Sequence, residues 1–486
     1  MIRRTILFFV MAITALAVPT ALAEPLVVVE EKLLTSWLPA DTADFGTSVA
    51  MSGDTLVVGA KFDQGIFWPE EGAVYVYERD GHDWVPQVKL FDPNPSNLSY
   101  FGVSVAIDGD VMAVGAMFTA DGPNFYPGSV TIFVRNGNEW NYQTRLFASD
   151  PVQFGHFGIA VALEGNRLVV GAPRAHGPSA DHQGAVYVYQ FNGVNWIEQA
   201  KLTALHGGTD HRFGSAVAIS NGTILAGAPL ESGIVVPGHG AAYVFVPIGE
   251  FWSQQARLVA SPLNPESAFG FQVAIDGETA VVAEPTIDLN GMNTVGQAHV
   301  FVRSGETWTA QATLVASDGD EYDYFGTGVD IDGDTLLCGA LNAAGTVYDN
   351  QGAVYVFTRD GATWTERGKI EASKPQQEAE GGFYGGTAVC LVGDTAVVGA
   401  QSQNGVQPFQ GAAYVYRLAV PECCKGDMDA STTVDIDDVQ LFVLTVLDAV
   451  GNGQELCGAD MDANGIIDGR DIQLFATKVI AAQPCP

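Results

Sequence analysis

FGTSVAMSGDTLVVGA, residues 45–60, is a stretch that this chain repeats with small changes along most of its length. It consists of two apolar runs on either side of a Ser-Gly-Asp turn, which is the pattern of a β-hairpin. Near copies begin at five further phenylalanines, each 56 residues after the last: Phe101, Phe157, Phe213, Phe269 and Phe325. Self-similarity at a constant period of this length predicts repeated supersecondary units.

Each repeat contains two more candidate strands after the hairpin. Runs such as GAVYVY (72–77) and WVPQVKL (84–90) recur with the same period and are rich in the β-branched and aromatic residues that strands favour. A looser seventh copy is FYGGTAVCLVGDTAVVGA (383–400). Four short antiparallel strands repeated seven times predict a mainly β fold, a seven-bladed β-propeller over residues 24–420.

The two ends of the repeat region indicate how the ring closes. The seventh copy has no fourth strand of its own, whereas VVEEKLL (28–34) lies 56 residues before WVPQVKL (84–90) with no first three strands ahead of it. The N-terminal strand is therefore predicted to complete the last blade and to remove the open strand edges. The recurring Trp and Gln of the fourth strand, such as Trp140 and Gln143, are interpreted as packing between blades rather than as sugar-binding platforms.

The motifs FGxSVA, VVGAP (169–173) and GAVYVY resemble FG-GAP repeats, the units of the integrin α-subunit propeller, over roughly residues 28–417. The resemblance implies a seven-bladed propeller used for recognition or adhesion, sometimes beside enzymes. Integrin-type repeats often hold calcium in the first hairpin, but here that hairpin is only a short turn. DIDGD (330–334) is the nearest approach, so no calcium is assigned to the propeller.

Residues 1–23 are predicted to be a secretory signal peptide, cleaved after Ala23. Arg3 and Arg4 precede a short apolar run, and Ala21-Leu22-Ala23 matches an A-x-A cleavage site. No later stretch is long and apolar enough to predict a membrane span. With 22 Lys and Arg against 56 Asp and Glu, the net charge of −34 argues against nucleic acid as a partner. The sequence predicts a secreted protein.

Two duplicated acidic stretches near the C-terminus predict calcium binding. DMDASTTVDIDD (427–438) and DMDANGIIDGRD (460–471) both offer oxygen ligands in the order of a 12-residue EF-hand-like loop. The predicted Ca²⁺ ligands are Asp427, Asp429, Ser431, Thr433, Asp435 and Asp438 in the first loop and Asp460, Asp462, Asn464, Ile466, Asp468 and Asp471 in the second. Thr433 and Ile466 would act through backbone carbonyls. Asn464-Gly465 suits the sharp turn better than Ser431-Thr432, so the second site is expected to be stronger.

An apolar run with helical spacing follows each loop, at 439–447 and 472–480. These loop–helix units resemble a type I dockerin, which implies a small α-helical calcium module over residues 421–486 and a cohesin-like protein partner. In that family the partner contacts loop positions 10 and 11, here Ile436, Asp437, Gly469 and Arg470. The two halves differ at these positions, so one binding orientation is expected rather than two.

Cysteines and histidines gave two further hypotheses. Cys423, Cys424, Cys457 and Cys485 lie in or beside the C-terminal module. Disulfides 424–457 and 423–485 are one of three possible pairings. Cys338 and Cys390 are interpreted as small buried hydrophobes. Loop histidines in the third and fourth repeats could converge on a second metal site, the alternative being polar loops with scattered histidines: His176, His182, His206, His211 and His239.

Two functions are compatible with these features. The first is a secreted, non-catalytic binding protein whose propeller loop face recognises a protein or glycan, and whose C-terminal module docks on a cohesin-like partner. The second is an enzyme, or an accessory protein, of extracellular polysaccharide degradation carried by a dockerin. No carboxylate pair or Ser-His-Asp set stands out from the repeat, which favours the first.

Overall fold

The computed structural model describes residues 27–36, 43–64, 70–81, 83–96, 98–122, 125–178, 180–233, 236–347, 349–373, 385–401 and 410–419. These residues lie in one compact unit, Val27–Ala419. The predicted signal peptide (1–23) and calcium module (421–486) lie outside the described residues. Regular structure in the described part consists of β-strands, and no helix there is long and apolar enough to cross a membrane.

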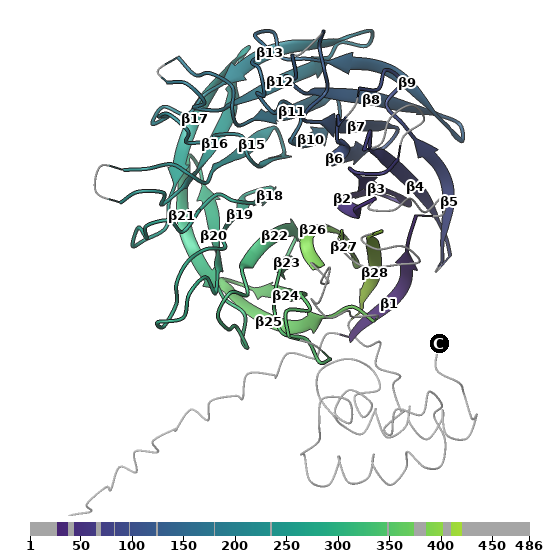
Figure 1. The fold of residues 1–486 in the computed structure, drawn as a ribbon. Coiled ribbons are helices and arrows are strands. Elements are labelled where there is room, and N and C mark those ends of the chain that lie inside the picture. The colour runs from purple at the N-terminus through teal and green to yellow at the C-terminus, as the bar shows by residue number, and fades with distance from the viewer. Residues whose placement is uncertain are drawn as a thin grey trace, which may run out of the picture. The chain divides into compact units, whose positions relative to one another are not determined.

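The strands pair into seven antiparallel four-stranded sheets around a central axis (Figure 1). Six blades use consecutive strands, from the innermost to the outermost. Blade 1 contains β2 (Phe45–Ser52), β3 (Thr55–Ala60), β4 (Ala73–Asp80) and β5 (Asp83–Leu90). Blade 2 contains β6 (Phe101–Asp108), β7 (Val111–Ala116), β8 (Ser129–Asn136) and β9 (Glu139–Leu146). Blade 3 contains β10 (Ala160–Glu164), β11 (Arg167–Ala172), β12 (Ala185–Phe191) and β13 (Trp196–Leu202). Blade 4 contains β14 (Val217–Ser220), β15 (Thr223–Ala228), β16 (Ala241–Ile248) and β17 (Phe251–Leu258). Blade 5 contains β18 (Val273–Asp276), β19 (Thr279–Glu284), β20 (Gln297–Ser304) and β21 (Thr307–Leu314). Blade 6 contains β22 (Phe325–Asp332), β23 (Thr335–Ala340), β24 (Ala353–Asp360) and β25 (Thr363–Ile370).

The seventh blade joins the two ends of the propeller. It contains β26 (Gly385–Val392), β27 (Thr395–Ala400) and β28 (Ala412–Ala419), and its outer strand is β1 (Val27–Leu34). β1 pairs antiparallel with β28, with Leu34 opposite Ala413 and Val28 opposite Leu418. The predicted closure by the N-terminal strand is confirmed, and so is the blade count of seven.

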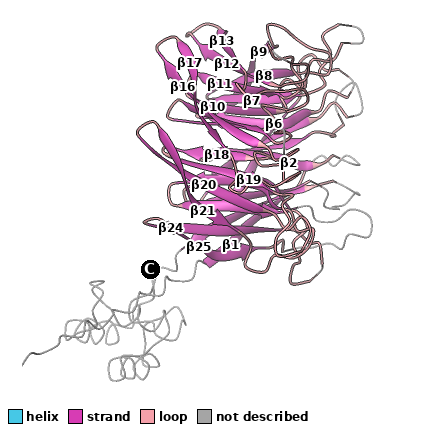
Figure 2. Ribbon diagram, turned by 90° about the vertical axis from the view of Figure 1, so that its left-hand side faces the viewer, coloured by secondary structure: helices cyan, strands magenta, loops and turns pink. Residues whose placement is uncertain are grey.

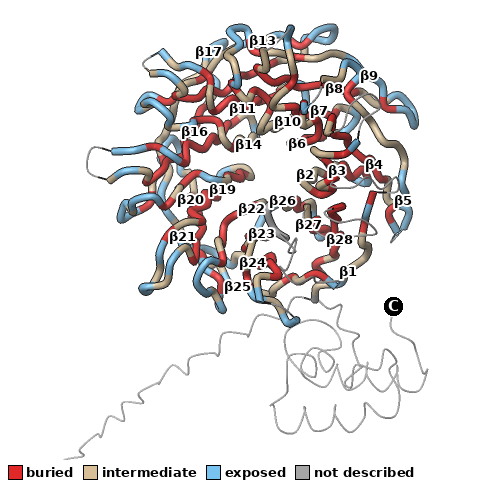
Figure 3. The backbone as a smooth tube through the Cα atoms, viewed as in Figure 1, coloured by how far each residue is buried: buried red, intermediate tan, exposed pale blue. Residues whose placement is uncertain are grey.

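Burial follows the layers within each blade (Figure 3). The second strand β3 and the first five residues of the third strand β4 are buried. The outer strand β5 is exposed or partly buried except at Trp84. Trp140 Nε1 in blade 2 donates a hydrogen bond to Gln87 Oε1 in blade 1 at 3.1 Å, and Trp196 donates to Gln143 at 2.9 Å across the next junction. This confirms that the recurring Trp and Gln link neighbouring blades.

The Phe-Gly pair that opens each repeat also forms the junction between blades. The Phe101 side chain is fully buried, and its backbone forms a parallel bridge with Gly72 of the preceding blade. Gly72 has φ of +84°, and a Cβ atom there would lie 2.0 Å from the Phe101 carbonyl oxygen. The same bridge recurs at five further junctions, including Phe45 with Gly411 where the ring closes. Close backbone contact therefore explains why these glycines repeat.

Gly72→Ala should destabilise the propeller strongly. The substitution combines an unfavourable backbone angle with a clash against backbone that cannot move aside, so we expect a loss of about 3 kcal/mol or more. Gly81→Ala is a matched control, because Gly81 has φ of +63° but nothing within 4 Å of a Cβ. That control should cost only about 1 kcal/mol. Chemical denaturation of both variants measures the difference, and equal losses would contradict the role given to the junction.

Candidate recognition face

The longer loops of the blades lie at one end of the propeller. The four strands of each sheet run in alternating directions from the innermost to the outermost. The second and the fourth strand therefore end at the same end of the propeller. The loop from the second to the third strand and the connection from the fourth strand to the next blade both lie there. Figure 2 shows the blades from the side, with connections at both ends. We call the end with the longer loops the loop face. Binding residues in repeat folds commonly lie on such loops.

Two positions per repeat form a rim on this face. One directly precedes the Phe of the Phe-Gly pair, and the other is the second residue after the second strand. The two are held together by the backbone: for example, Phe118 N donates to Ser99 O at 3.2 Å, and Arg174 N to Gly155 O at 3.2 Å. The rim residues of blades 1 to 6 are Asp44 and Phe62, Tyr100 and Phe118, His156 and Arg174, Arg212 and Leu230, Ala268 and Thr286, and Tyr324 and Asn342.

Aromatic rings follow one another along the rim of blades 1 to 3. Ring centroids are 4.9 Å apart for Phe62 and Tyr100, 5.1 Å for Tyr100 and Phe118, and 4.9 Å for Phe118 and His156, all edge to face. Phe154, which is 44% exposed, also contacts Phe118. These rings are only partly buried, so they form an accessible apolar ridge on the loop face. We call Phe62, Tyr100, Phe118, His156 and Phe154 the aromatic ridge.

The backbone at this ridge is held in an uncommon conformation. Tyr100, Phe154 and His156 have φ between +55° and +57°, a backbone conformation that residues other than glycine rarely adopt. The local environment also disfavours a positive charge on His156. Burial lowers the pKa of His156 to about 4, and the nearby positive charges of Arg174 and Arg212 contribute to this shift. His156 is therefore neutral at physiological pH and contributes to the ridge as an aromatic ring.

The structure does not bring the five predicted loop histidines together as one set of metal ligands. His176 and His182 stack with ring centroids 5.5 Å apart, and each has an Asp oxygen at 3.4 Å from Nδ1, Asp181 and Asp210 respectively. The others do not join them. His206 is exposed, and His211 Nδ1 accepts a hydrogen bond from Gly208 N. His239 is buried, with Nδ1 at 2.6 Å from Gly240 O. Among the described residues, no three His, Cys, Asp or Glu side chains are placed to hold a metal ion.

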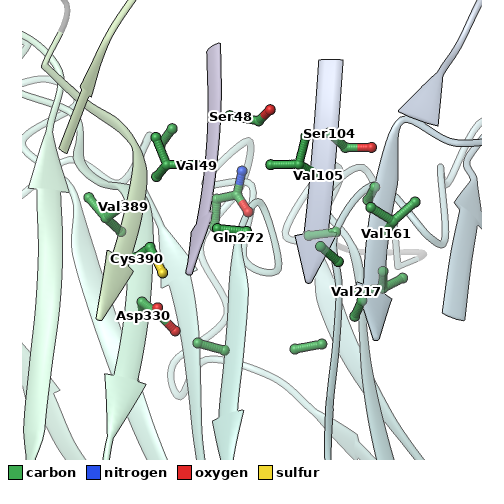
Figure 4. Close-up of a pocket in the computed structure, with 18 of the residues that line it drawn as sticks. Ser48, Val49, Ser104, Val105, Val161, Val217, Gln272, Asp330, Val389 and Cys390 are labelled. Carbon is green, nitrogen blue, oxygen red and sulfur yellow. The ribbon is translucent and has the colours of Figure 1, made fainter. Parts of the chain in front are cut away.

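The central channel is a cavity of about 420 Å³ lined by the inner strands of the seven blades (Figure 4). Its lining is mostly Val, Ala and Ile, with Asp330 as an acidic exception. Asp330 Oδ2 accepts from Leu391 N of the next blade at 2.7 Å, and Oδ1 accepts from its own neighbour, Ile331 N. Burial raises the pKa of Asp330 to about 7. Cys390 lies beside it, and burial raises the pKa of that thiol as well.

The other two carboxylates of DIDGD (330–334) serve different partners. Asp332 Oδ2 accepts from Gly393 N at 2.6 Å, in the first hairpin turn of the next blade. Asp334 pairs with Arg359 Nε at 2.6 Å. The three side chains therefore do not gather around one point. Cys338 and Cys390 are both buried and free, which confirms their interpretation as small buried residues.

A buried tyrosine, a carboxylate and a basic residue form a recurring cluster in the blades. In blade 3 the Tyr187 hydroxyl donates to Asp150 at 2.7 Å, and Lys201 pairs with the same carboxylate at 2.6 Å. Blade 6 has the same arrangement of Tyr355, Asp318 and Lys369. The clusters satisfy polar groups that burial would otherwise leave without partners.

Blade 5 replaces this cluster with a different set. His299 takes the tyrosine position and Thr313 the lysine position. His299 Nε2 lies 2.7 Å from Glu284 Oε2, and Nδ1 lies 3.3 Å from Thr313 Oγ1. A hydroxyl, an imidazole and a carboxylate in line are also found in hydrolases. His299 and Thr313 stand at cluster positions, while Glu284 supplies the carboxylate from the end of β19, where blades 3 and 6 have Ala172 and Ala340. We therefore interpret the set as a variant of the structural cluster.

The rim was not predicted from the sequence. The loop histidines were singled out by residue type, whereas the aromatic ridge uses positions at fixed offsets from the repeat Phe. The available signal was that the residue before the Phe changes from blade to blade, while the Phe-Gly pair that follows it stays constant. The predicted calcium ligands and cohesin contacts, residues 427–471, lie outside the described residues.

Comparison with known proteins agrees with the repeat architecture. The family model for the FG-GAP repeat matches residues 30–77, 84–133, 140–189, 196–245, 252–301 and 308–357, which is more than half of the chain. No curated protein matches the chain in sequence. Among solved structures, a protein from Lactobacillus plantarum is similar at 16% identity with a TM-score of 0.43, covering 67% of this chain and 85% of that one. The chain belongs to the FG-GAP repeat family, and its repeats form a seven-bladed β-propeller closed by its N-terminal strand.

Proposed function

We propose that this is a secreted, non-catalytic binding protein that recognises an extracellular protein or glycan with the loop face of its propeller. The aromatic ridge is the observation that supports this most directly. Partly exposed rings that contact one another offer a rigid apolar surface, and exposed apolar surface on a soluble protein is commonly an interaction site. Family membership supports the same class of function, since the FG-GAP propeller suggests a binding or adhesion-type fold.

Binding of the full chain to glycan and protein arrays tests this function, with a hydrolase screen alongside. Tyr100→Ala combined with Phe118→Ala should weaken binding about tenfold or more, since aromatic anchors dominate such surfaces. Tyr142→Ala is a matched control, because Tyr142 is 44% exposed on the outer strand β9 rather than on the rim. Turnover of a bound glycan would favour the enzyme alternative, and binding unaffected by the rim variant would contradict the proposed face.

The C-terminal residues 421–486 are proposed to be a dockerin-like module that binds two Ca²⁺ ions and docks on a cohesin-like partner. The support is the duplicated spacing of oxygen ligands in the two loops. Metal that binds only the folded module stabilises it, by ~2.7 kcal/mol at a hundredfold excess over Kd. A segment of this size has a small core, so calcium would contribute a large share of its stability.

Asp460→Ala should reduce calcium binding more than Asp427→Ala does. Both remove the first ligand of a loop, but the second loop has the better turn at Asn464-Gly465. Calorimetric titration of the full chain with Ca²⁺ after chelation measures this, and each variant is the control for the other. Absence of any calcium heat with Kd below ~1 mM would contradict the module, because extracellular calcium sites reach at least that affinity.

A further inference from the structure

Two arginines occupy neighbouring rim positions where blades 3 and 4 meet. The equivalent rim positions are Phe62 and Tyr100 at the junction of blades 1 and 2, and Phe118 and His156 at the junction of blades 2 and 3. The ring centroids of each pair are 4.9 Å apart. Arg174 and Arg212 take the same two positions at the next junction. Both lie close enough to His156 to lower its pKa.

Neither guanidinium pairs with a carboxylate of the residues that the structure describes. Arg135, Arg257 and Arg359 in the same propeller each pair with a carboxylate within 3 Å. By contrast, Arg174 and Arg212 form no side-chain hydrogen bond or ion pair with any described residue. In a chain with net charge −34, two adjacent arginines without an acidic partner are unexpected. Holding two like charges together costs free energy unless an anion lies between them.

The residues around Arg174 and Arg212 indicate which kind of anion would bind there. Planar guanidinium groups bind carboxylate and phosphate oxygens in a fork geometry. The partly exposed rings of Phe118 and His156 lie on one side, and Leu230 is 37% exposed on the other. The acidic remainder of the protein repels ligands of high charge density, such as polyphosphates. A single carboxylate on a ring with an apolar face fits these conditions.

We infer that Arg174 and Arg212 form a subsite for the carboxylate of a sugar acid, with the adjoining aromatic ridge against the sugar ring. This rests on the proposed function of the loop face as a recognition surface. It narrows the ligand to a glycan that contains uronic acid residues. The ligand would bind without any covalent step.

Calorimetry on the full chain at low ionic strength tests the subsite, with glucose oligomers that carry one glucuronic acid residue and neutral glucose oligomers of equal length as probes. We expect the acidic oligomers to bind and the neutral ones to bind at least tenfold more weakly. Arg174→Gln and Arg212→Gln should each weaken binding about 10- to 100-fold, the range for hydrogen bonds between charged groups. Added salt should weaken binding as well.

Lys61→Gln is the matched control, since it removes one positive charge beside the rim in blade 1, where Lys61 already pairs with Asp44 at 3.1 Å. It should leave the affinity within about twofold. Three results would overturn the inference: no binding of the acidic oligomers, binding unaffected by both arginine variants, or equally tight binding of inorganic phosphate. If the arrays still identify a protein or neutral glycan that depends on Tyr100 and Phe118, the proposed function stands without this subsite.

Discussion

Deleting residues 24–34 should unfold the propeller or leave it aggregating, with a loss of at least about 5 kcal/mol in the free energy of unfolding. The deletion removes all of β1 and exposes the edge of β28, which otherwise has seven paired positions with β1. An unpaired strand edge is a template for association with other chains. β1 also packs against blade 1, since Leu34 is buried in the cluster that contains Tyr75. Thermal unfolding and light scattering measure the effect.

A peptide of residues 24–36 added to the truncated chain should restore much of the stability, because the missing strand would pair with β28 again. The same peptide with Leu34→Asp is the control, since it places a charge at a position that is 3% exposed. That control peptide should fail to restore stability. A truncated chain that melts at the temperature of the full chain would show that β1 does not close the ring.

Replacing Asp330 should stabilise the protein at neutral and alkaline pH. The pKa of this carboxyl is about 7 in the folded chain and 3.8 as the reference for the unfolded chain. A raised pKa means that the folded state disfavours the charged form. The resulting destabilisation is absent below about pH 4, grows as pH rises between the two pKa values, and is complete above about pH 7. The difference in pKa sets an upper bound of about 4 kcal/mol, because Asp330 is only partly buried.

Asp330→Ala gives this position the residue found at the equivalent place in blades 1 to 5. We expect it to raise the free energy of unfolding at pH 8 by about 2–4 kcal/mol. The gain is smaller than the pKa difference implies because the variant also loses the hydrogen bond from Leu391 N. Asp330→Asn removes the charge but keeps the shape, so it should behave similarly. Near pH 4 this gain should be absent, and Asp330→Ala should be slightly less stable than the unsubstituted protein because it lacks the Leu391 hydrogen bond. Lower stability of both variants at pH 8 would show that the carboxylate stabilises the channel.

Most of the propeller was predictable because its determinants are local and repeated. The hairpin in residues 45–60 needs only a turn and two apolar runs, and the same pattern at a constant spacing implies equal blades. Closure was predictable from one comparison, because VVEEKLL (28–34) aligned with the fourth strand of blade 1. The pairing of β1 with β28 followed from the need to cover a strand edge.

The rim was not predictable in this way. Phe62 and Tyr100 are 38 residues apart and belong to different blades, and only ring closure around the axis brings their side chains into contact. The same is true of Asp330, which the sequence placed in an acidic run next to Asp332 and Asp334. Asp330 and Asp332 both accept from backbone N–H groups of blade 7, whereas Asp334, in the turn after β22, pairs with Arg359. Only the packing of blade 7 against blade 6 brings those N–H groups to the first two carboxylates.

The sequence by itself therefore determined the number of blades, the order of their strands and the strand that closes the ring. These depend on hydrogen bonding between neighbouring strands, which the period and the alternation of residues specify directly. The tertiary structure alone decided which loop residues meet on the rim, which arginines have no acidic partner among the described residues, and which carboxyl lines the channel. Those properties depend on distances between blades and on exclusion of water, and neither is encoded in any short stretch of the chain.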